Sequence, residues 1–550
     1  MDMYLLLFLF VLILRPLLVF AAWGYTDDGS NYVIDVGSKL VFKVSKTNGD
    51  INSIVYGGTE YQGYSGKNSH IESGLGRSTV TITSYSSPSY LIKVTVTYGT
   101  LVHYIVARYG QNNIYLLTNK GDVSVPASRF ILRLKGNILP HDSSMPDFYD
   151  DGGAAIEASD VTQSPHGYTK SKHYQGSNYG RVMDFDYVGK TTGRVGIWLI
   201  RSNHEKASGG PFFRSLVRRS SSDADDLYEI LFYSMGHTDP QRWGLQGPYV
   251  LSFTDGETPK KELFARNANW SWFDTLGIKG WVAGSARGYV AGVGIANMKN
   301  GYTYTVALSN PDHQYWGVAA GGGGAYTIKS VVPGTYKLTV YKGEYEVYTT
   351  SITAKAGSAT SLNTIKPDSD PSDVTAIWRI GDWDGTPGGF LNFESTPYKP
   401  TYMHPSDPRL SSWDPEDFTV GKTATSSFPG YMWKDVNNDH LVYFKLTAAQ
   451  ITSEKTIRIG ITEAYANGRP IIAVNGWNSP LSSASTQGGT RSLTVGTYRG
   501  NNHIYSFTVP ASAFLTDANG WNILKISVIS GSGNTGYLSA GISIDCVDLY

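Results

Sequence analysis

Residues 90–119 read YLIKVTVTYGTLVHYIVARYGQNNIYLLTN, and this stretch decides the class of fold. Short runs rich in Val, Ile, Leu, Tyr and Thr are separated by turn residues at Gly99 and Gly110. Runs of this composition, bounded by glycine and asparagine, are typical of β-strands joined by tight turns. The stretch lacks the periodicity of a long amphipathic helix. It therefore predicts consecutive antiparallel strands.

The same pattern recurs on both sides of this stretch. The runs are KLVFKVS at 39–45, INSIVYGG at 51–58, SRFILRLKG at 128–136, VGIWLIR at 195–201 and DLYEILFYSMG at 226–236. Hydrophobic residues make up 41% of the chain and charged residues 17%, with 61 Gly and 38 Tyr, which is the composition of an all-β protein. Residues 22–276 are therefore predicted to form one large β-sandwich. The polar, irregular residues 140–180 predict a long loop rather than strands.

The rest of the chain predicts two further β domains. Residues 277–365 contain strand-like runs and the turn Pro333-Gly334, which fit a small sandwich of the fibronectin III type. Residues 366–373, KPDSDPSD, have the composition of a linker. Residues 374–550 are again rich in strand-like runs and resemble the jelly-roll modules that bind carbohydrate. The sequence thus predicts an all-β chain of three domains in series.

The N-terminus predicts export from the cell. Residues 1–21 are mostly apolar and end at the small residues Ala21 and Ala22, which is the pattern of a signal peptide cut after Ala21. A membrane anchor is the alternative interpretation. Arg15-Pro16 disfavours it, because this pair interrupts the apolar run well short of the ~20 residues that a membrane span needs. We expect a secreted, extracellular protein with no membrane span.

Charge and cysteine content narrow the range of partners. Lys+Arg and Asp+Glu both number 46, so the net charge gives no reason to expect nucleic acid binding. Cys546 is the one cysteine, so no internal disulfide can form. It lies in the alternating apolar segment ISIDCVDLY, which predicts a buried and inert thiol. No coiled-coil pattern suggests a dimer, and we expect a monomer.

A series of short motifs runs through the whole chain. They are SHIESGLG at 69–76, RFILRL at 129–134, DGGAAIE at 151–157, KSKHY at 170–174, GGPF at 209–212, YSMGH at 233–237, GLQGPY at 244–249, WRIGDWDGTPGGF at 378–390 and MHPSDPRLSSW at 403–413. In this order the motifs resemble those of rhamnogalacturonan lyases of polysaccharide lyase family 4. The resemblance implies a galactose mutarotase-like first domain, a fibronectin III-like second domain, a jelly-roll third domain and rhamnogalacturonan I as substrate.

The resemblance also implies eliminative cleavage of the galacturonate–rhamnose backbone without a cofactor. A base must remove the C5 proton, cations must offset the charge of the intermediate, and an acid must protonate the leaving oxygen. Lys172 is the implied base, and its pKa must be depressed by burial or a nearby cation. The motif, not the chemistry, selects Lys172 over Lys170. His237 is the implied acid, because histidine titrates near neutrality.

Arg129 and Arg133 have an interpretation that does not depend on the family. Strand alternation puts both arginines on one face and the neighbouring apolar side chains on the other. Guanidinium groups bind carboxylates in bidentate geometry, so galacturonate carboxylates are suitable ligands. The alternative is a solvated outer face with two surface arginines. Tyr233 is expected to orient His237 or to contact a sugar, with a packed tyrosine as the alternative.

Two other function classes stay open. Glu157 and Asp160 could serve a glycoside hydrolase with two carboxylates, although bonding to a glycine-rich loop explains them as well. A non-catalytic, pectin-binding protein could have the same three domains. Oxygen ligands for a structural Ca²⁺ in the third domain are offered by Asp382, Asp384, Asp545 and Asp548. The sequence shows no zinc cluster, phosphate loop or serine nucleophile elbow.

Overall fold

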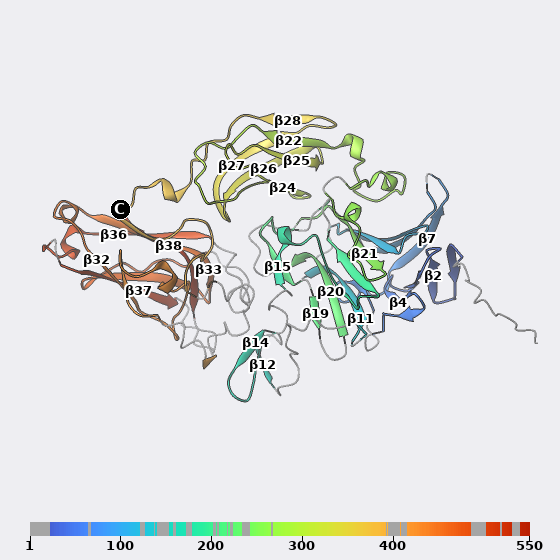
Figure 1. Ribbon diagram of the computed structural model, residues 1–550, viewed down its shortest axis with the longest axis horizontal. Helices are drawn as coiled ribbons and strands as arrows, with labels where there is room; N and C mark the ends of the chain where they lie inside the picture. The colour runs from blue at the N-terminus through green and yellow to red at the C-terminus, as the bar shows by residue number, and fades with distance from the viewer. Residues whose placement is uncertain are drawn as a thin grey trace, which may run out of the picture.

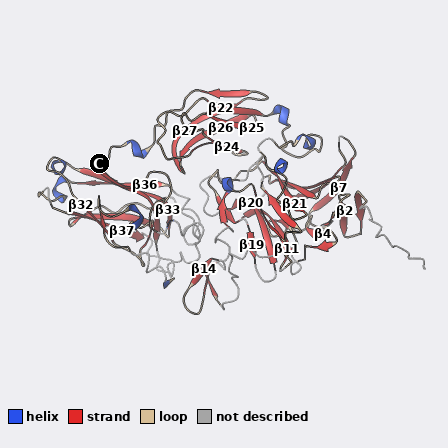
Figure 2. Cartoon of the chain, viewed as in Figure 1, coloured by secondary structure: helices blue, strands red, loops and turns tan. Residues whose placement is uncertain are grey.

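The structure is a computed structural model that describes most of the chain after the predicted signal peptide. The described residues are 22–63, 68–87, 89–121, 127–136, 138–139, 153–157, 161–171, 179–201, 205, 208–216, 218–220, 224–233, 242–265, 268–391, 393, 407–408, 415–485, 502–517, 520–530 and 540–550. They form strands, turns and a few short 3-10 helices (Figure 2). The predicted all-β class is therefore confirmed. Within these residues, no helix is long and apolar enough to span a membrane.

Three sheets share one core in the first domain (Figure 1). The largest has the order β16-β17-β21-β10-β9-β8-β7, with bounds Tyr187–Thr191, Gly196–Ile200, Leu245–Thr254, Asn113–Asn119, Leu101–Arg108, Leu91–Tyr98 and Thr79–Tyr85. The second runs from β1 to β5, with bounds Gly24–Asp27, Asn31–Asp35, Leu40–Ser45, Ile51–Tyr56 and Thr59–Glu60. The third has the order β19-β20-β11-β6, with bounds Arg218–Ser220, Ala224–Tyr233, Ala127–Lys135 and His70–Ile71. The opening stretch of sequence thus forms β8, β9 and β10, as predicted.

Residues 140–180 contain strands that the sequence did not predict. Their described parts hold the sheet β12-β13-β14, with bounds Ala154–Glu157, Val161–Gln163 and Thr169–Ser171. They also include β15, Tyr179–Arg181, which pairs with β18, Arg214–Leu216. The prediction of a loop without strands is therefore wrong here. These strands are too short to show hydrophobic alternation, and the β13–β14 hairpin is closed by polar turn contacts such as Gly167 N to Ser164 O at 2.9 Å.

The second domain is a small sandwich of two sheets. One has the order β25-β22-β28, with bounds Tyr326–Val331, Gly288–Gly292 and Ala359–Leu362. The other has the order β24-β23-β26-β27, with bounds Gln314–Val318, Tyr304–Ser309, Gly334–Lys342 and Tyr345–Ala354. Tyr304, Leu338 and Val340 are among the side chains that fill the core between them. This arrangement matches the predicted fibronectin III-like unit.

The third domain is a larger sandwich, drawn in orange and red in Figure 1. In one sheet β38 (Gly541–Leu549) is flanked by β33 (Lys455–Tyr465) and β29 (Trp378–Gly381), with β36 (His503–Val509) beyond β33 and β31 (Tyr431–Trp433) also on β38. The facing sheet has the order β30-β32-β37-β34-β35, with bounds Phe418–Thr419, His440–Phe444, Asn522–Ser530, Gly468–Val474 and Trp477–Asn478. Cys546 on β38 is fully buried, which confirms the predicted burial, and this burial raises the pKa of its thiol.

Buried ion pairs fix the domains to one another. Glu205 of the first domain pairs with Arg287 of the second, accepts a hydrogen bond from Tyr315 Oη at 2.9 Å and lies 3.3 Å from His313 Nδ1. Its side chain is only 1% exposed. The predicted linker 366–373 is also held in place, because buried Asp370 accepts hydrogen bonds from Lys342 Nζ at 2.6 and 2.7 Å. The chain therefore passes from domain to domain through ordered, charged junctions.

We predict that Glu205→Ala destabilises the protein strongly, because it leaves Arg287 buried without its carboxylate. The expected loss is about 3–5 kcal/mol in the free energy of unfolding, measured by urea denaturation. The exposed pair Lys39–Asp255 is the control, and Lys39→Ala should cost less than about 1 kcal/mol. Equal losses in the two variants would contradict a special role for the domain junction.

Candidate active site

Along β11 the side chains alternate between a face that packs into the core and a face that carries two arginines. In its register Phe130 faces Glu229 and Leu132 faces Leu227, and both Phe130 and Leu132 lie in the first-domain core. The next positions along the strands form the opposite face, where Arg129 lies beside Ile230, Ile131 beside Tyr228 and Arg133 beside Asp226. Both arginines thus share a face opposite the core, and the predicted alternation is confirmed. Ile131 is buried as well, so this second face is covered rather than fully solvated.

Arg133 is held inside the fold by a carboxylate. Its guanidinium lies 3.2 Å from Asp226, which is buried on the neighbouring strand. Asp226 also accepts a hydrogen bond from Tyr228 Oη at 3.1 Å. The ion pair therefore joins Arg133 on β11 to Asp226 on β20, and it satisfies the charge of Arg133 within the sheet.

Arg129 is in a different state, although it lies only four residues away on the same face of β11. Its guanidinium donates one long hydrogen bond, to Ser73 Oγ at 3.4 Å. Its Nε is buried and has no hydrogen-bond partner among the described residues. Glu72 adjoins it in a left-handed turn with φ of 59°. Burial raises the pKa of the Glu72 carboxyl, and the nearby Arg129 charge opposes this shift.

Lys120 is a functional candidate that the sequence analysis missed. It follows β10 directly and is fully buried, and its Nζ has no hydrogen-bond partner among the described residues. The ammonium lies 5.3 Å from the Phe232 ring and 4.9 Å from the Trp243 ring. Burial lowers the pKa of Lys120 to about 8, and the Glu72 charge opposes this shift. Nothing in the local sequence TNKG signals this, because the aromatic rings come from distant parts of the chain.

The end of β20 brings several of these residues together. Tyr233 ends the strand and pairs through its backbone with Ala127, close to Arg129 on β11. Phe232, beside the Lys120 ammonium, precedes Tyr233. His237 follows Tyr233 by four positions and lies outside the described residues. Lys172 follows Ser171 at the end of β14 and also lies outside them. The roles of Lys172, His237, Arg129, Arg133 and Tyr233 therefore stay predictions.

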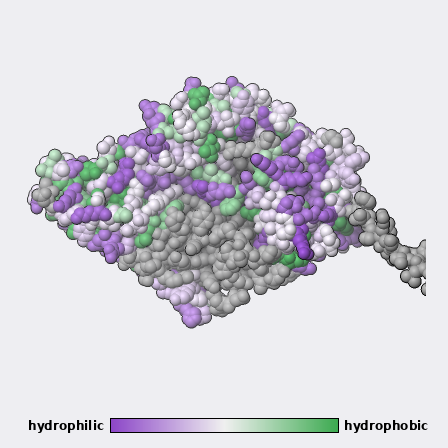
Figure 3. Space-filling model, in the orientation of Figure 1, coloured by the Kyte–Doolittle hydropathy of each residue, from purple (hydrophilic) through white to green (hydrophobic). Residues whose placement is uncertain are grey.

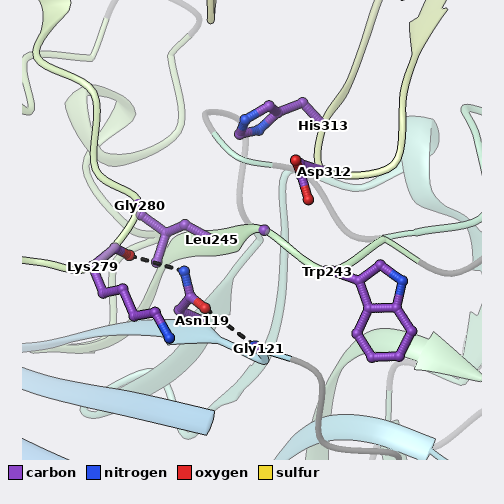
Figure 4. A pocket seen from close by; sticks show the side chains of 9 residues that line it. Asn119, Gly121, Trp243, Leu245, Lys279, Gly280, Asp312 and His313 are labelled. Carbon is purple, nitrogen blue, oxygen red and sulfur yellow. Dashed lines mark hydrogen bonds between the residues drawn. The ribbon is translucent and has the colours of Figure 1, made fainter. Parts of the chain in front are cut away.

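A cavity of about 540 Å³ opens beside this end of the sandwich, at the junction with the second domain (Figure 4). Asn119 and Trp243 of the first domain line it, together with Asp312 and His313 of the second. Trp243 is 36% exposed, so its indole contacts the cavity and also approaches buried Lys120. An exposed aromatic ring among polar side chains is a suitable surface for sugar rings.

The aspartates of the calcium prediction already have partners in the protein. Asp548 pairs with Arg379 at 3.1 Å and with Arg458 at 2.6 Å. Asp545 accepts hydrogen bonds from the backbone amides of residues 384–386. Among the described residues, no group of three or more His, Cys, Asp and Glu side chains is arranged to hold a metal ion. Asp548 is therefore unsuited to calcium, and calcium binding by the rest of the set stays a prediction.

Comparison with known proteins identifies the family. Residues 23–280 match the model described as rhamnogalacturonan lyase B, N-terminal. Residues 286–362 match polysaccharide lyase family 4, domain II, and residues 376–549 match polysaccharide lyase family 4, domain III. The matches follow the chain in the order of its three sandwiches.

Curated relatives are similar over almost the whole chain. Rhamnogalacturonate lyase A of Emericella nidulans is 40% identical over 535 residues, which cover 96% of this chain and 96% of that protein. Rhamnogalacturonate lyase A of Aspergillus aculeatus is 37% identical over 534 residues, with the same coverage of both chains. Among solved structures, the crystal structure of YidC from Thermotoga maritima aligns over 46% of this chain and 55% of that one. The TM-score is only 0.22 and the sequence identity 8%. The chain belongs to polysaccharide lyase family 4.

We predict that the two arginines of β11 differ in their effect on stability. Arg133→Ala should lower the free energy of unfolding by about 3–5 kcal/mol, because it removes the guanidinium that lies 3.2 Å from buried Asp226. Arg129→Ala should cost less than about 1 kcal/mol, because its hydrogen bond to Ser73 Oγ is long and exposed. Urea denaturation of both variants measures the difference. Equal destabilisation would contradict the prediction that Arg133 stabilises the fold more than Arg129 does.

We predict a pH-dependent stability effect from Lys120. Its pKa is lower in the folded protein than the ordinary value of 10.5, so the unfolded chain binds more protons between pH 8 and 10.5. The stability of the natural protein relative to Lys120→Met should therefore rise through this window. At pH 7 the methionine variant should be more stable by about 1–3 kcal/mol. Thermal unfolding of both proteins across pH tests this, and a methionine variant less stable at pH 7 would contradict it.

Proposed function

We propose that this protein cleaves the backbone of rhamnogalacturonan I between galacturonate and rhamnose by β-elimination, leaving an unsaturated galacturonate end. The observation that carries this proposal is the 40% identity to rhamnogalacturonate lyase A of Emericella nidulans across 96% of both chains. Hydrophilic side chains gather over the first domain on the face seen in Figure 3, as a surface that meets a polar polymer requires. Neither a carboxylate-based hydrolase nor a non-catalytic pectin-binding protein is favoured by the relatives.

In the proposed reaction, Lys172 as a neutral amine takes the C5 proton of galacturonate. The C–H electrons form the C4–C5 double bond while the bond from C4 to the glycosidic oxygen breaks. His237 as an imidazolium protonates that oxygen, which leaves with the rhamnose. No water is consumed, and the base and the acid return to their starting forms when a proton is exchanged with solvent.

The cations of the first domain supply the remaining requirement. Removal of the C5 proton places negative charge next to the C6 carboxylate, and donors aimed at that charge lower the barrier. Arg129 suits this task better than Arg133, because Asp226 already neutralises Arg133. We propose that Arg129 binds the galacturonate carboxylate directly, that Arg133 holds the strand beside the substrate, and that Tyr233 orients His237. A cation near Lys172 would also favour the neutral amine that the base requires.

The remaining sequence predictions fit an enzyme that acts on plant cell-wall pectin. We infer that residues 1–21 direct secretion, since their apolar run ends in small residues at the expected cleavage position. We propose that the protein acts outside the cell as a monomer on a polysaccharide that cannot enter it. Sedimentation of the purified protein would test the monomer.

We predict that the natural protein generates the ultraviolet absorbance of an unsaturated uronate from rhamnogalacturonan but not from homogalacturonan. Lys172→Ala and His237→Ala should each lose at least about 100-fold in kcat, as expected for removal of a general base or acid, without unfolding. Reducing ends without the new absorbance would indicate a hydrolase. Binding without any loss of polymer length would indicate a non-catalytic protein.

Lys170→Ala serves as the matched control for the base. Both lysines lie in the same short motif, and only the motif distinguishes them. An inactive Lys170→Ala variant beside an active Lys172→Ala variant would transfer the role to Lys170.

A further inference from the structure

The β13–β14 hairpin leads directly into the segment that carries Lys172. Ser164 N donates to Tyr168 O at 2.8 Å, and Gln163 Nε2 donates to Gly167 O at 2.9 Å, so the turn is well defined. The hairpin belongs to a three-stranded sheet that is separate from the large sheets of the first domain. In Figure 1 this small sheet lies between the first and third domains. Its position must therefore be set by contacts other than the main core.

A buried carboxylate of the third domain provides such a contact. Asp407 accepts two hydrogen bonds on Oδ2, from Thr169 N at 2.6 Å and from Thr169 Oγ1 at 2.9 Å. Asp407 is 2% exposed and Thr169 is fully buried. The ring of the next residue, Pro408, lies against Gly167, where an added Cβ would be 3.8 Å away. Hydrogen bonds to an ionised carboxylate are short and strong. This contact therefore fixes the position of β14 relative to the third domain, whereas pairing with β13 fixes only its register.

The other side of the Lys172 segment is anchored by the second domain. Residues 172–178 join β14 to β15, and Arg181 is the last residue of β15. Arg181 donates to buried Glu344 at 3.0 Å and to Asp184 at 2.6 and 2.8 Å. Glu344 lies in the turn between β26 and β27 of the second domain. The two accessory domains thus hold the strands on both sides of the segment.

We propose that Asp407 is a positioning residue for catalysis, through which the third domain holds the β13–β14 hairpin that precedes Lys172 in the chain. This inference rests on the proposed function, in which Lys172 is the base. Lys172 comes three positions after Thr169, and a base must meet the C5 proton with an error well below one ångström. Asp407 of the motif MHPSDPRLSSW therefore acts on the reaction in the first domain.

Other contacts hold the third domain in place, so Asp407 is not needed merely to attach it. Lys342 and Asp370 form a buried pair that orders the linker, and Lys299 pairs with Asp373 at 2.6 Å on its surface. Glu344 N of the second domain donates to Asp384 O of the third at 2.7 Å. Loss of Asp407 should consequently release the hairpin while the three domains stay assembled. This distinction makes the proposal testable with single substitutions in the full-length protein.

The test compares Asp407→Ala, Asp407→Asn, Thr169→Val and the control Asp373→Ala. Asp407→Ala should lower kcat on rhamnogalacturonan about 10- to 100-fold with little change in KM, because a displaced base affects the reaction more than binding. Asp407→Asn keeps an oxygen acceptor for Thr169 and should restore most of the lost kcat. Thr169→Val should lose less than Asp407→Ala, and the double variant should be no worse than Asp407→Ala alone. Asp373→Ala removes an exposed junction pair and should leave kcat unchanged.

Hydrogen exchange of the peptide that covers residues 161–171 gives a readout independent of activity. Asp407→Ala should exchange this peptide faster than the natural protein, and Asp373→Ala should not. An Asp407→Ala protein that keeps its kcat, or loses it only in step with its thermal stability, would overturn the positioning role. A natural protein with no lyase activity would instead overturn the proposed function, and the exchange result would still decide whether Asp407 holds the hairpin.

Discussion

The pairing of β11 with β20 is the interaction on which the candidate site depends. One face of this pair contributes Phe130 and Leu132 to the first-domain core, and the other carries both arginines. Because side chains alternate strictly along a strand, the burial of one face fixes the direction of the other. A register slip of one residue would turn both guanidinium groups into the core. The packing of Phe130 and Leu132 in the core thus also determines where the two arginines point.

The cations of the first domain fall into two groups, according to whether a carboxylate of the protein neutralises them. Arg133 is neutralised by Asp226, and the buried pairs Lys190–Asp225 and Arg201–Glu229 are satisfied in the same way on the inner side of β20. These ion pairs link neighbouring strands or sheets of the first domain. Arg129 and Lys120 lack comparable partners among the described residues. Buried charge that a fold does not neutralise lowers stability, and such groups gather at functional sites. An anionic substrate would supply the negative charge that these two cations lack.

Buried contacts hold the three domains together, so they are not joined by flexible linkers alone. Glu205 links the first domain to the second, Asp370 orders the connection to the third, and Asp407 returns from the third domain to the first. The contacts come from residues far apart in sequence and are largely buried. A chain without disulfides can be held rigid in this way, because each junction places opposite charges where water cannot compete with them.

The sequence by itself determined the all-β class, the three-domain order, the buried thiol of Cys546 and the shared face of Arg129 and Arg133. These features follow from local periodicity and composition, which a strand expresses wherever it is placed. Only the tertiary structure decided that Arg133 is neutralised, that Lys120 is buried between aromatic rings and that residues 154–171 form a sheet. Each of these depends on partners distant in the chain, and a short polar strand such as β14 has no pattern of its own. Its place is set by a carboxylate more than two hundred residues later, at Asp407.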